Sequence, residues 1–222
     1  MKKLFTLTIA IGLTISSFAQ IQSLAGPRIG VVYISSSPAS AFLNGDFTIF
    51  EDYESEADVK ENYDNIANSG TLTTLYGWQF ESRFADGGDI TGIVEWIILA
   101  GGMERGKFLP SVSSMVGART SSGLEFAVGP NLSLGGIAMV FGAGYNFKVG
   151  NLNMPVNFAF VPGRKATREI EGIWEDVYYD PDGIPDNGDE YWEEGVHTSG
   201  PYDVDYHTGN RFSITFGFNL NK

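Results

Sequence analysis

The side chains best suited to chemistry in this sequence are the carboxylates of one short segment, residues 180–190. Its order is Asp180-Pro181-Asp182-Gly183-Ile184-Pro185-Asp186-Asn187-Gly188-Asp189-Glu190. Calcium sites need several oxygen ligands and a backbone that turns sharply between them. The segment therefore predicts a calcium site with these ligands: Asp180, Asp182, Asp186, Asp189 and Glu190.

A solvated acidic loop without a bound ion is the alternative interpretation of this segment. Counted from Asp180, an EF-hand would need a ligand at Ile184, a glycine at Pro185 and a glutamate at Tyr191, so that pattern is not met. The segment is instead similar to the Asp-rich repeats of thrombospondin type 3, of which it holds one partial copy. Both interpretations place it in an exposed loop.

Most of the acidity of the chain lies in two stretches. Residues 46–64 contain eight acidic side chains and residues 169–205 contain thirteen, out of 27 in the whole sequence. The formal net charge of −13 argues against nucleic-acid binding, which requires a basic face. The two stretches favour binding of divalent cations or of an extracellular ligand.

Enzymatic chemistry has little support in the sequence. The only histidines are His197 and His207, and no nucleophile elbow or other specific spacing accompanies them. The chain has no cysteine, which excludes thiolate chemistry, disulfides and a cysteine-linked lipid anchor. We therefore expect a protein that is not an enzyme.

The elements that must position these loops are strands, because apolar residues recur with period two after residue 70. At the C-terminus Phe212, Ile214, Phe216 and Phe218 alternate with polar or small residues. Eight such segments can be counted, at about 27–35, 72–84, 90–101, 110–119, 123–132, 136–148, 151–162 and 209–220. Most have the ten or so residues that a tilted strand needs to cross a bilayer.

The connections between these segments differ in length. Tight turns follow the second, fourth and sixth segments, and long acidic loops occupy about 36–71 and 163–208. Short periplasmic turns and longer external loops are typical of outer-membrane barrels. We predict an all-β fold: an eight-stranded antiparallel up-and-down transmembrane β-barrel with short periplasmic turns and long acidic external loops.

The orientation of the faces separates a membrane barrel from a soluble one. A soluble barrel points its apolar residues inward, whereas a membrane barrel points them at lipid. The apolar set is too bulky for the interior of eight strands, so we expect the membrane arrangement. Trp78, Phe158 and Phe216 should then face lipid, and Glu81, Asn157 and Arg211 should face the lumen. Glu95 is ambiguous, since it shares its face with Ile93 and Ile97.

The N-terminus has the pattern of an export signal. Lys2 and Lys3 precede an apolar stretch and small residues near Ala19, as in a cleavable signal peptide, although an N-terminal membrane anchor is the alternative. We expect residues 1–20 to be the signal peptide and residues 21–222 to form a single barrel domain. The expected location is the outer membrane.

Three sequence stretches resemble known barrel and envelope proteins. Residues 211–218, Arg-Phe-Ser-Ile-Thr-Phe-Gly-Phe, are similar to the C-terminal strand of small eight-stranded outer-membrane β-barrels. The runs 123–131 and 150–157 resemble uncharacterised envelope proteins of Gram-negative bacteria, a similarity that covers about residues 72–220. The resemblance implies a barrel surrounded by outer-membrane lipid and implies no activity. A structural or loop-mediated binding role is expected; a narrow porin-like channel and an outer-membrane enzyme acting on lipid or peptide are the alternatives.

Overall fold

The computed structural model describes residues 23–46, 61, 70–150, 152–170, 173–181, 188, 191–199 and 201–220. The predicted signal peptide and four of the five predicted calcium ligands lie outside these residues. The chain forms two compact units. Among the described residues, the first contains 23–34, 72–162 and 210–220, and the second contains 35–71 and 163–209.

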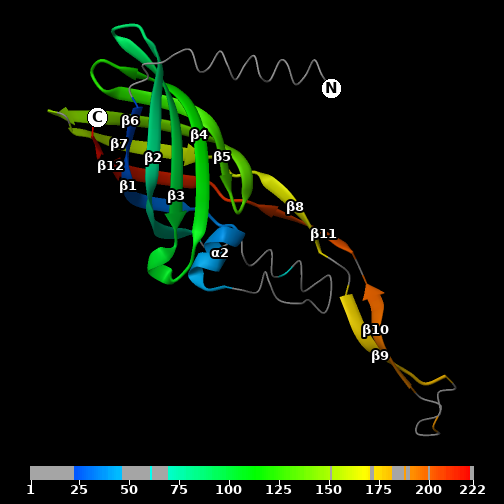
Figure 1. Cartoon of the computed structure of the whole chain (residues 1–222). Coiled ribbons are helices and arrows are strands. Elements are labelled where there is room, and N and C mark those ends of the chain that lie inside the picture. Colours follow the sequence, from blue (N-terminus) through cyan, green and yellow to red (C-terminus); the bar gives the residue numbers. More distant parts are fainter. Residues whose placement is uncertain are drawn as a thin grey trace, which may run out of the picture. The chain divides into compact units, whose positions relative to one another are not determined.

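The first unit is a closed antiparallel β-barrel of eight strands, the last of which is interrupted at Phe218. The strands are β1 (Ser23–Ile34), β2 (Thr71–Asp86), β3 (Ile90–Gly101), β4 (Leu109–Thr120), β5 (Leu124–Ser133), β6 (Gly136–Val149), β7 (Leu152–Val161) and β12 (Arg211–Gly217), continued by β13 (Asn219–Leu220). Each strand pairs with its neighbour in the chain order, and β12 pairs with both β7 and β1, which closes the barrel. Figure 1 shows the first and last strands side by side. The predicted strand number and order are confirmed.

In the described part of the second unit lies a short helix, α2 (Pro38–Asn44), which the sequence analysis did not predict. A capping box starts it, because the Ser40 amide donates to Ser37 Oγ at 3.3 Å and the Ser37 amide donates to Ser40 Oγ at 2.9 Å. Gly45 ends it with φ of 93°, a left-handed conformation that glycine adopts without strain.

The long connection between β7 and β12 contains two ladders of paired strands. β8 (Lys165–Ile170) pairs with β11 (Tyr202–His207), and β9 (Ile173–Tyr179) pairs with β10 (Tyr191–Ser199). Both pairings are antiparallel, so the connection folds back on itself as a hairpin. The turn-forming Asp-Pro-Asp-Gly segment lies between β9 and β10, as such residues do between hairpin strands.

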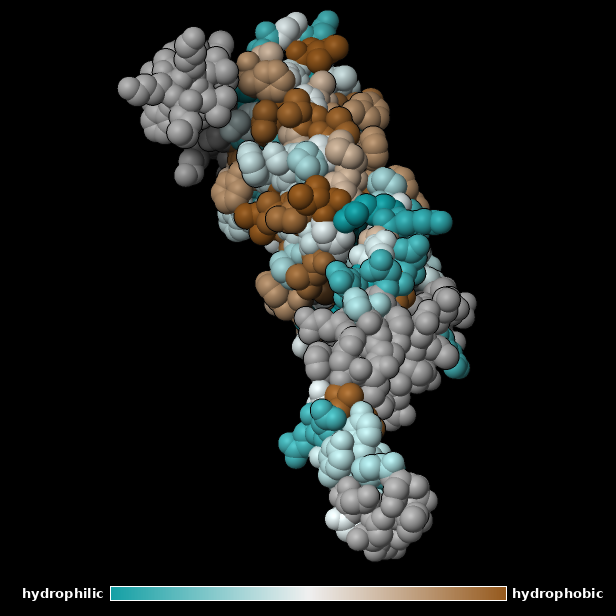
Figure 2. Space-filling model, turned by 90° about the vertical axis from the view of Figure 1, so that its right-hand side faces the viewer, coloured by the Kyte–Doolittle hydropathy of each residue, from teal (hydrophilic) through white to brown (hydrophobic). Residues whose placement is uncertain are grey.

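Side chains in the barrel strands alternate between interior and exterior. In β2 the interior residues Gln79 and Glu81 are 0% and 1% exposed, whereas Trp78 and Phe80 on the other face are 44% and 48% exposed. Figure 2 shows hydrophobic side chains gathered over the barrel wall on the face in view. No helix among the described residues combines the length and the apolar character needed to span a membrane.

Part of the barrel interior is apolar and tightly packed. Met115, Val140 and Val161 form a buried cluster on strands β4, β6 and β7. Close backbone approach matters as well: a Cβ on Gly77 would lie 1.9 Å from the Ile98 carbonyl oxygen. Only glycine fits there, because the neighbouring strand's backbone occupies the space that a side chain would need.

Candidate functional site

The barrel interior contains a layer of charged and amide side chains that we call the lumenal network. Its members are Arg28 on β1, Gln79 and Glu81 on β2, Glu95 on β3, Arg119 on β4 and Glu125 on β5. All six are at most 7% exposed. Strand alternation brings them together, since each occupies an interior position of its own strand.

Arg119 is the centre of the lumenal network. Its Nη1 donates to Glu81 Oε1 at 2.7 Å and its Nη2 donates to Glu81 Oε2 at 2.5 Å, which makes a two-pronged ion pair. Its Nε donates to Glu125 Oε1 on the neighbouring strand. The Glu81 pair joins β4 to β2 across β3, so Arg119 cross-links strands that share no backbone ladder.

The other members extend the lumenal network around the interior. Gln79 Nε2 donates to Glu95 Oε1, and Arg28 Nη1 donates to the Pro155 carbonyl oxygen at 3.1 Å. The Arg28 guanidinium lies over Gly217, where a Cβ would come within 2.2 Å of Nη1. Glycine at position 217 thus leaves the space in which the Arg28 guanidinium lies against β12.

The structure confirms which of the predicted side chains point outward and which point inward, whereas contact of the outer face with lipid stays a prediction. Trp78, Phe158 and Phe216 point outward and are 44%, 56% and 48% exposed, whereas Glu81 is buried inside. Asn157 and Arg211 also lie on the interior face and are half-buried. The ambiguous Glu95 is inside as well, together with the fully buried Ile93.

The predicted calcium ligands cannot be placed together. Asp180 follows directly after β9, while Asp182, Asp186, Asp189 and Glu190 lie outside the described residues. In the part of the chain that the structure describes, no group of three or more His, Cys, Asp or Glu side chains is arranged to hold a metal ion.

The two histidines are on strands of the second unit. His207 ends β11, is exposed, and accepts a hydrogen bond at Nδ1 from the Gly209 amide at 3.1 Å. His197 lies on β10 and its backbone pairs with Trp174.

A polar cluster at the β3–β4 connection was not predicted from the sequence. We call it the rim clamp, and its side chains are Thr73, Thr74, Glu104 and Arg105. Glu104, in the short 3-10 helix η2 (Met103–Arg105), accepts hydrogen bonds from Thr73 Oγ1 at 2.5 Å, from Thr74 Oγ1 and from the Thr74 amide at 3.2 Å. Arg105 Nη2 donates to the Leu72 carbonyl oxygen at 2.9 Å. Burial alone would raise the pKa of Glu104, but the threonine hydrogen bonds outweigh it and lower the pKa to about 2.

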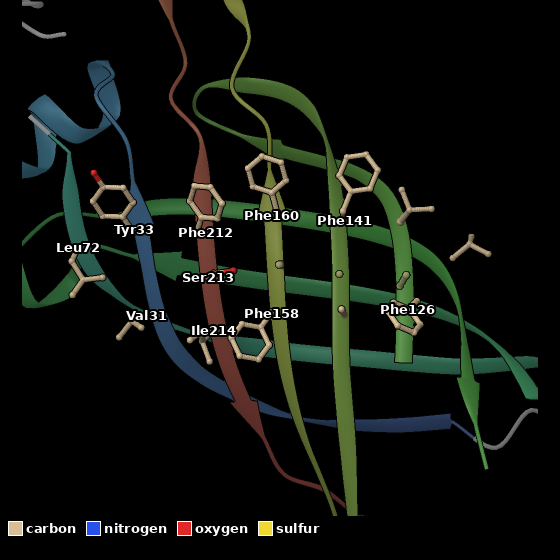
Figure 3. A pocket seen from close by; sticks show the side chains of 16 residues that line it. Val31, Tyr33, Leu72, Phe126, Phe141, Phe158, Phe160, Phe212, Ser213 and Ile214 are labelled. Atoms are coloured by element: carbon tan, nitrogen blue, oxygen red, sulfur yellow. The ribbon is translucent and has the colours of Figure 1, made fainter. Parts of the chain in front are cut away.

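The outer wall has a hollow of about 770 Å³ between aromatic side chains, including Phe126, Phe141, Phe158 and Phe212 (Figure 3). These four are 50–57% exposed, so the hollow is open to the outside. It forms because the small Ala143 pairs with Phe126 on one side and Phe158 on the other. A methyl group between two phenylalanines leaves the space unfilled.

The fold and the site together define a class: a closed eight-stranded antiparallel β-barrel with a charged interior and an apolar exterior. Comparison of the chain with protein-family models, with curated proteins and with solved structures finds no match.

Proposed function

We propose that this chain is an outer-membrane β-barrel with a structural or loop-mediated binding role and no catalytic activity. The observation that carries the proposal is the inverted polarity of the barrel wall. Large apolar side chains are exposed on all eight strands, among them Ile29, Val31, Trp78, Phe80, Trp96, Ile98, Val116, Phe126, Val128, Phe141, Phe147, Phe158, Phe212 and Phe216. Soluble monomers rarely expose a contiguous apolar surface above a few hundred Å².

The length of the strands supports the same proposal. The strands β1 to β7 have between 10 and 16 residues. At roughly 3.3 Å per residue and a tilt of about 45°, ten residues rise about 23 Å along the barrel axis. This rise matches the apolar band of about 25 Å found on outer-membrane barrels.

The lumenal network supports a structural role in preference to a channel. Its side chains come from five neighbouring strands and meet in the interior of a barrel that eight strands leave only just wide enough for side chains. Arginine–carboxylate pairs across such a lumen hold the wall together and occupy the path of an ion. The function then depends on the external loops and the hairpin.

Tryptophan quenching by lipids tests the membrane location. The chain has four tryptophans, of which Trp78 and Trp96 are on the outer barrel wall and Trp174 and Trp192 are on the hairpin strands. A variant with Trp174→Phe and Trp192→Phe leaves only the two wall residues as reporters. Folded into vesicles with brominated acyl chains, it should lose most of its fluorescence, because both indoles would contact the bromines.

The matched control keeps the hairpin residues and carries Trp78→Phe and Trp96→Phe. Its fluorescence should be little affected by brominated lipid and should instead be quenched by acrylamide in the water. Quenching of Trp78 and Trp96 by acrylamide, with no effect of brominated lipid, would refute the membrane location.

A further inference from the structure

The ladder of β9 and β10 presents aromatic side chains on a two-stranded ribbon. Tyr178, Tyr179, Tyr191 and Trp192 are between 37% and 65% exposed. The rings of Tyr178 and Trp192 lie 5.2 Å apart, and those of Tyr179 and Tyr191 lie 5.4 Å apart. Residues directly opposite in an antiparallel pair share a face, and successive residues alternate between faces. These two aromatic pairs therefore lie on opposite faces of the ribbon.

The ribbon is embedded in the most acidic part of the chain. From Glu169 to Asp205 there are thirteen acidic residues and no lysine or arginine. An exposed aromatic surface of this kind therefore lies in a strongly negative local potential. Such a potential repels anionic partners and attracts cationic ones.

The face with Tyr178 and Trp192 combines an indole, the ring that binds cations best, with the carboxylate of Asp176. Alternation places Asp176 on this face, and its Oδ1 accepts a hydrogen bond from the Gly195 amide at 3.0 Å, which fixes the carboxylate near the aromatic pair. Asp180 and Glu194 each follow by two residues, Asp180 after Tyr178 and Glu194 after Trp192.

The opposite face carries two phenol rings, Tyr179 and Tyr191, followed along the ladder by the pair Val177 and Glu193. An indole attracts a cation more strongly than a phenol does. A cation would therefore choose the face with Tyr178 and Trp192.

We infer that this face binds a cationic polypeptide, with an arginine or lysine side chain over the Tyr178–Trp192 pair and beside Asp176. A cation is attracted to the face of an indole or phenol ring, and a guanidinium also forms strong hydrogen bonds to carboxylates. A neutral carbohydrate would stack on the rings and gain nothing from the charge. The inference rests on the proposed function, in which the loops of a membrane-embedded barrel bind an external ligand.

Binding of a labelled oligo-arginine peptide to the full chain in lipid vesicles tests the inference. Fluorescence anisotropy should show saturable binding that weakens as salt is added, and no binding of an oligo-glutamate peptide. The double variant Tyr178→Ala with Trp192→Ala should bind about tenfold more weakly, because it loses both rings. Asp176→Asn should bind roughly threefold more weakly, because it keeps an oxygen for the Gly195 amide and loses the charge.

The matched control is Tyr179→Ala with Tyr191→Ala, which removes two aromatic rings from the other face and should bind within about twofold of the wild type. Equal losses in the two double variants, or affinity for a neutral glucan without affinity for oligo-arginine, would overturn the inference. Lipid quenching of Trp78 and Trp96 in the same samples keeps the two proposals separate. Normal quenching without peptide binding would overturn the inference alone, whereas peptide binding without quenching would overturn the membrane location.

Discussion

Removing the arginine at the centre of the lumenal network should strongly destabilise the barrel. Arg119→Ala takes away the partner of both Glu81 and Glu125, whose side chains are 0% and 4% exposed. Removing one partner of a buried ion pair costs about 3–5 kcal/mol, since the remaining charge stays buried and uncompensated. We expect a loss of this size in the free energy of unfolding, measured by urea titration in vesicles with tryptophan fluorescence as the signal.

Arg83→Ala is the matched control for this experiment. The Arg83 side chain is 29% exposed, and its Nε lies 3.9 Å from Glu81 Oε1. This contact is longer than the two hydrogen bonds from Arg119 to Glu81, and its loss leaves Glu81 paired with Arg119, so Arg83→Ala should cost clearly less than Arg119→Ala. The triple variant Arg119→Met, Glu81→Met and Glu125→Leu should recover most of the lost stability, because it removes Arg119 together with both of its carboxylate partners. Equal losses for Arg119→Ala and Arg83→Ala would refute the view that the lumenal network cross-links the wall.

Three further predictions concern the rim, the lumen and the acidic loop. Glu104→Gln should lower the free energy of unfolding by roughly 1 kcal/mol at neutral pH. Because folding lowers the pKa of Glu104 from 4.5 to about 2, the stability difference between wild type and variant should fade as the pH drops through that range. A stability difference that does not change with pH would contradict this prediction. The purified barrel should conduct no appreciable current in planar bilayers, and stable reproducible openings would count against a closed lumen. Calcium should bind weakly to residues 180–190, at about 10⁻⁴ to 10⁻³ M; calorimetry giving equal heats for the wild type and for Asp182→Ala with Asp186→Ala would reduce this segment to a solvated loop.

The barrel strands could be predicted from the sequence because the alternation of apolar and polar residues lies within each strand. Alternation of Tyr76, Trp78 and Phe80 with Gly77, Gln79 and Glu81 specifies a two-faced strand whatever its partners are. Glu95 could not be assigned in this way, because Ile93 and Ile97 share its face. The structure shows that the lumen mixes an apolar part with a charged part, so an isoleucine and a glutamate can both point inward.

The contacts between distant strands were beyond the sequence analysis. Arg119 and Glu81 are 38 residues apart on non-adjacent strands, and their pairing depends on the cross-section of the closed barrel. The rim clamp depends likewise on how Glu104 meets Thr73 and Thr74, about 30 residues earlier. The hairpin strands β9 and β10 were also not predicted. They contain aromatic and β-branched residues that favour strands, but the many acidic residues around them indicated an unpaired loop.

Single-cysteine labelling tests the central claim, an apolar wall in contact with lipid, most directly. The chain has no cysteine, so Phe216→Cys and the exposed turn variant Ser121→Cys each introduce one unique thiol. A charged, membrane-impermeant maleimide should label the turn thiol readily in vesicles and the wall thiol very slowly, while both should react fully in urea. Equally fast labelling of the two thiols in vesicles would contradict the account.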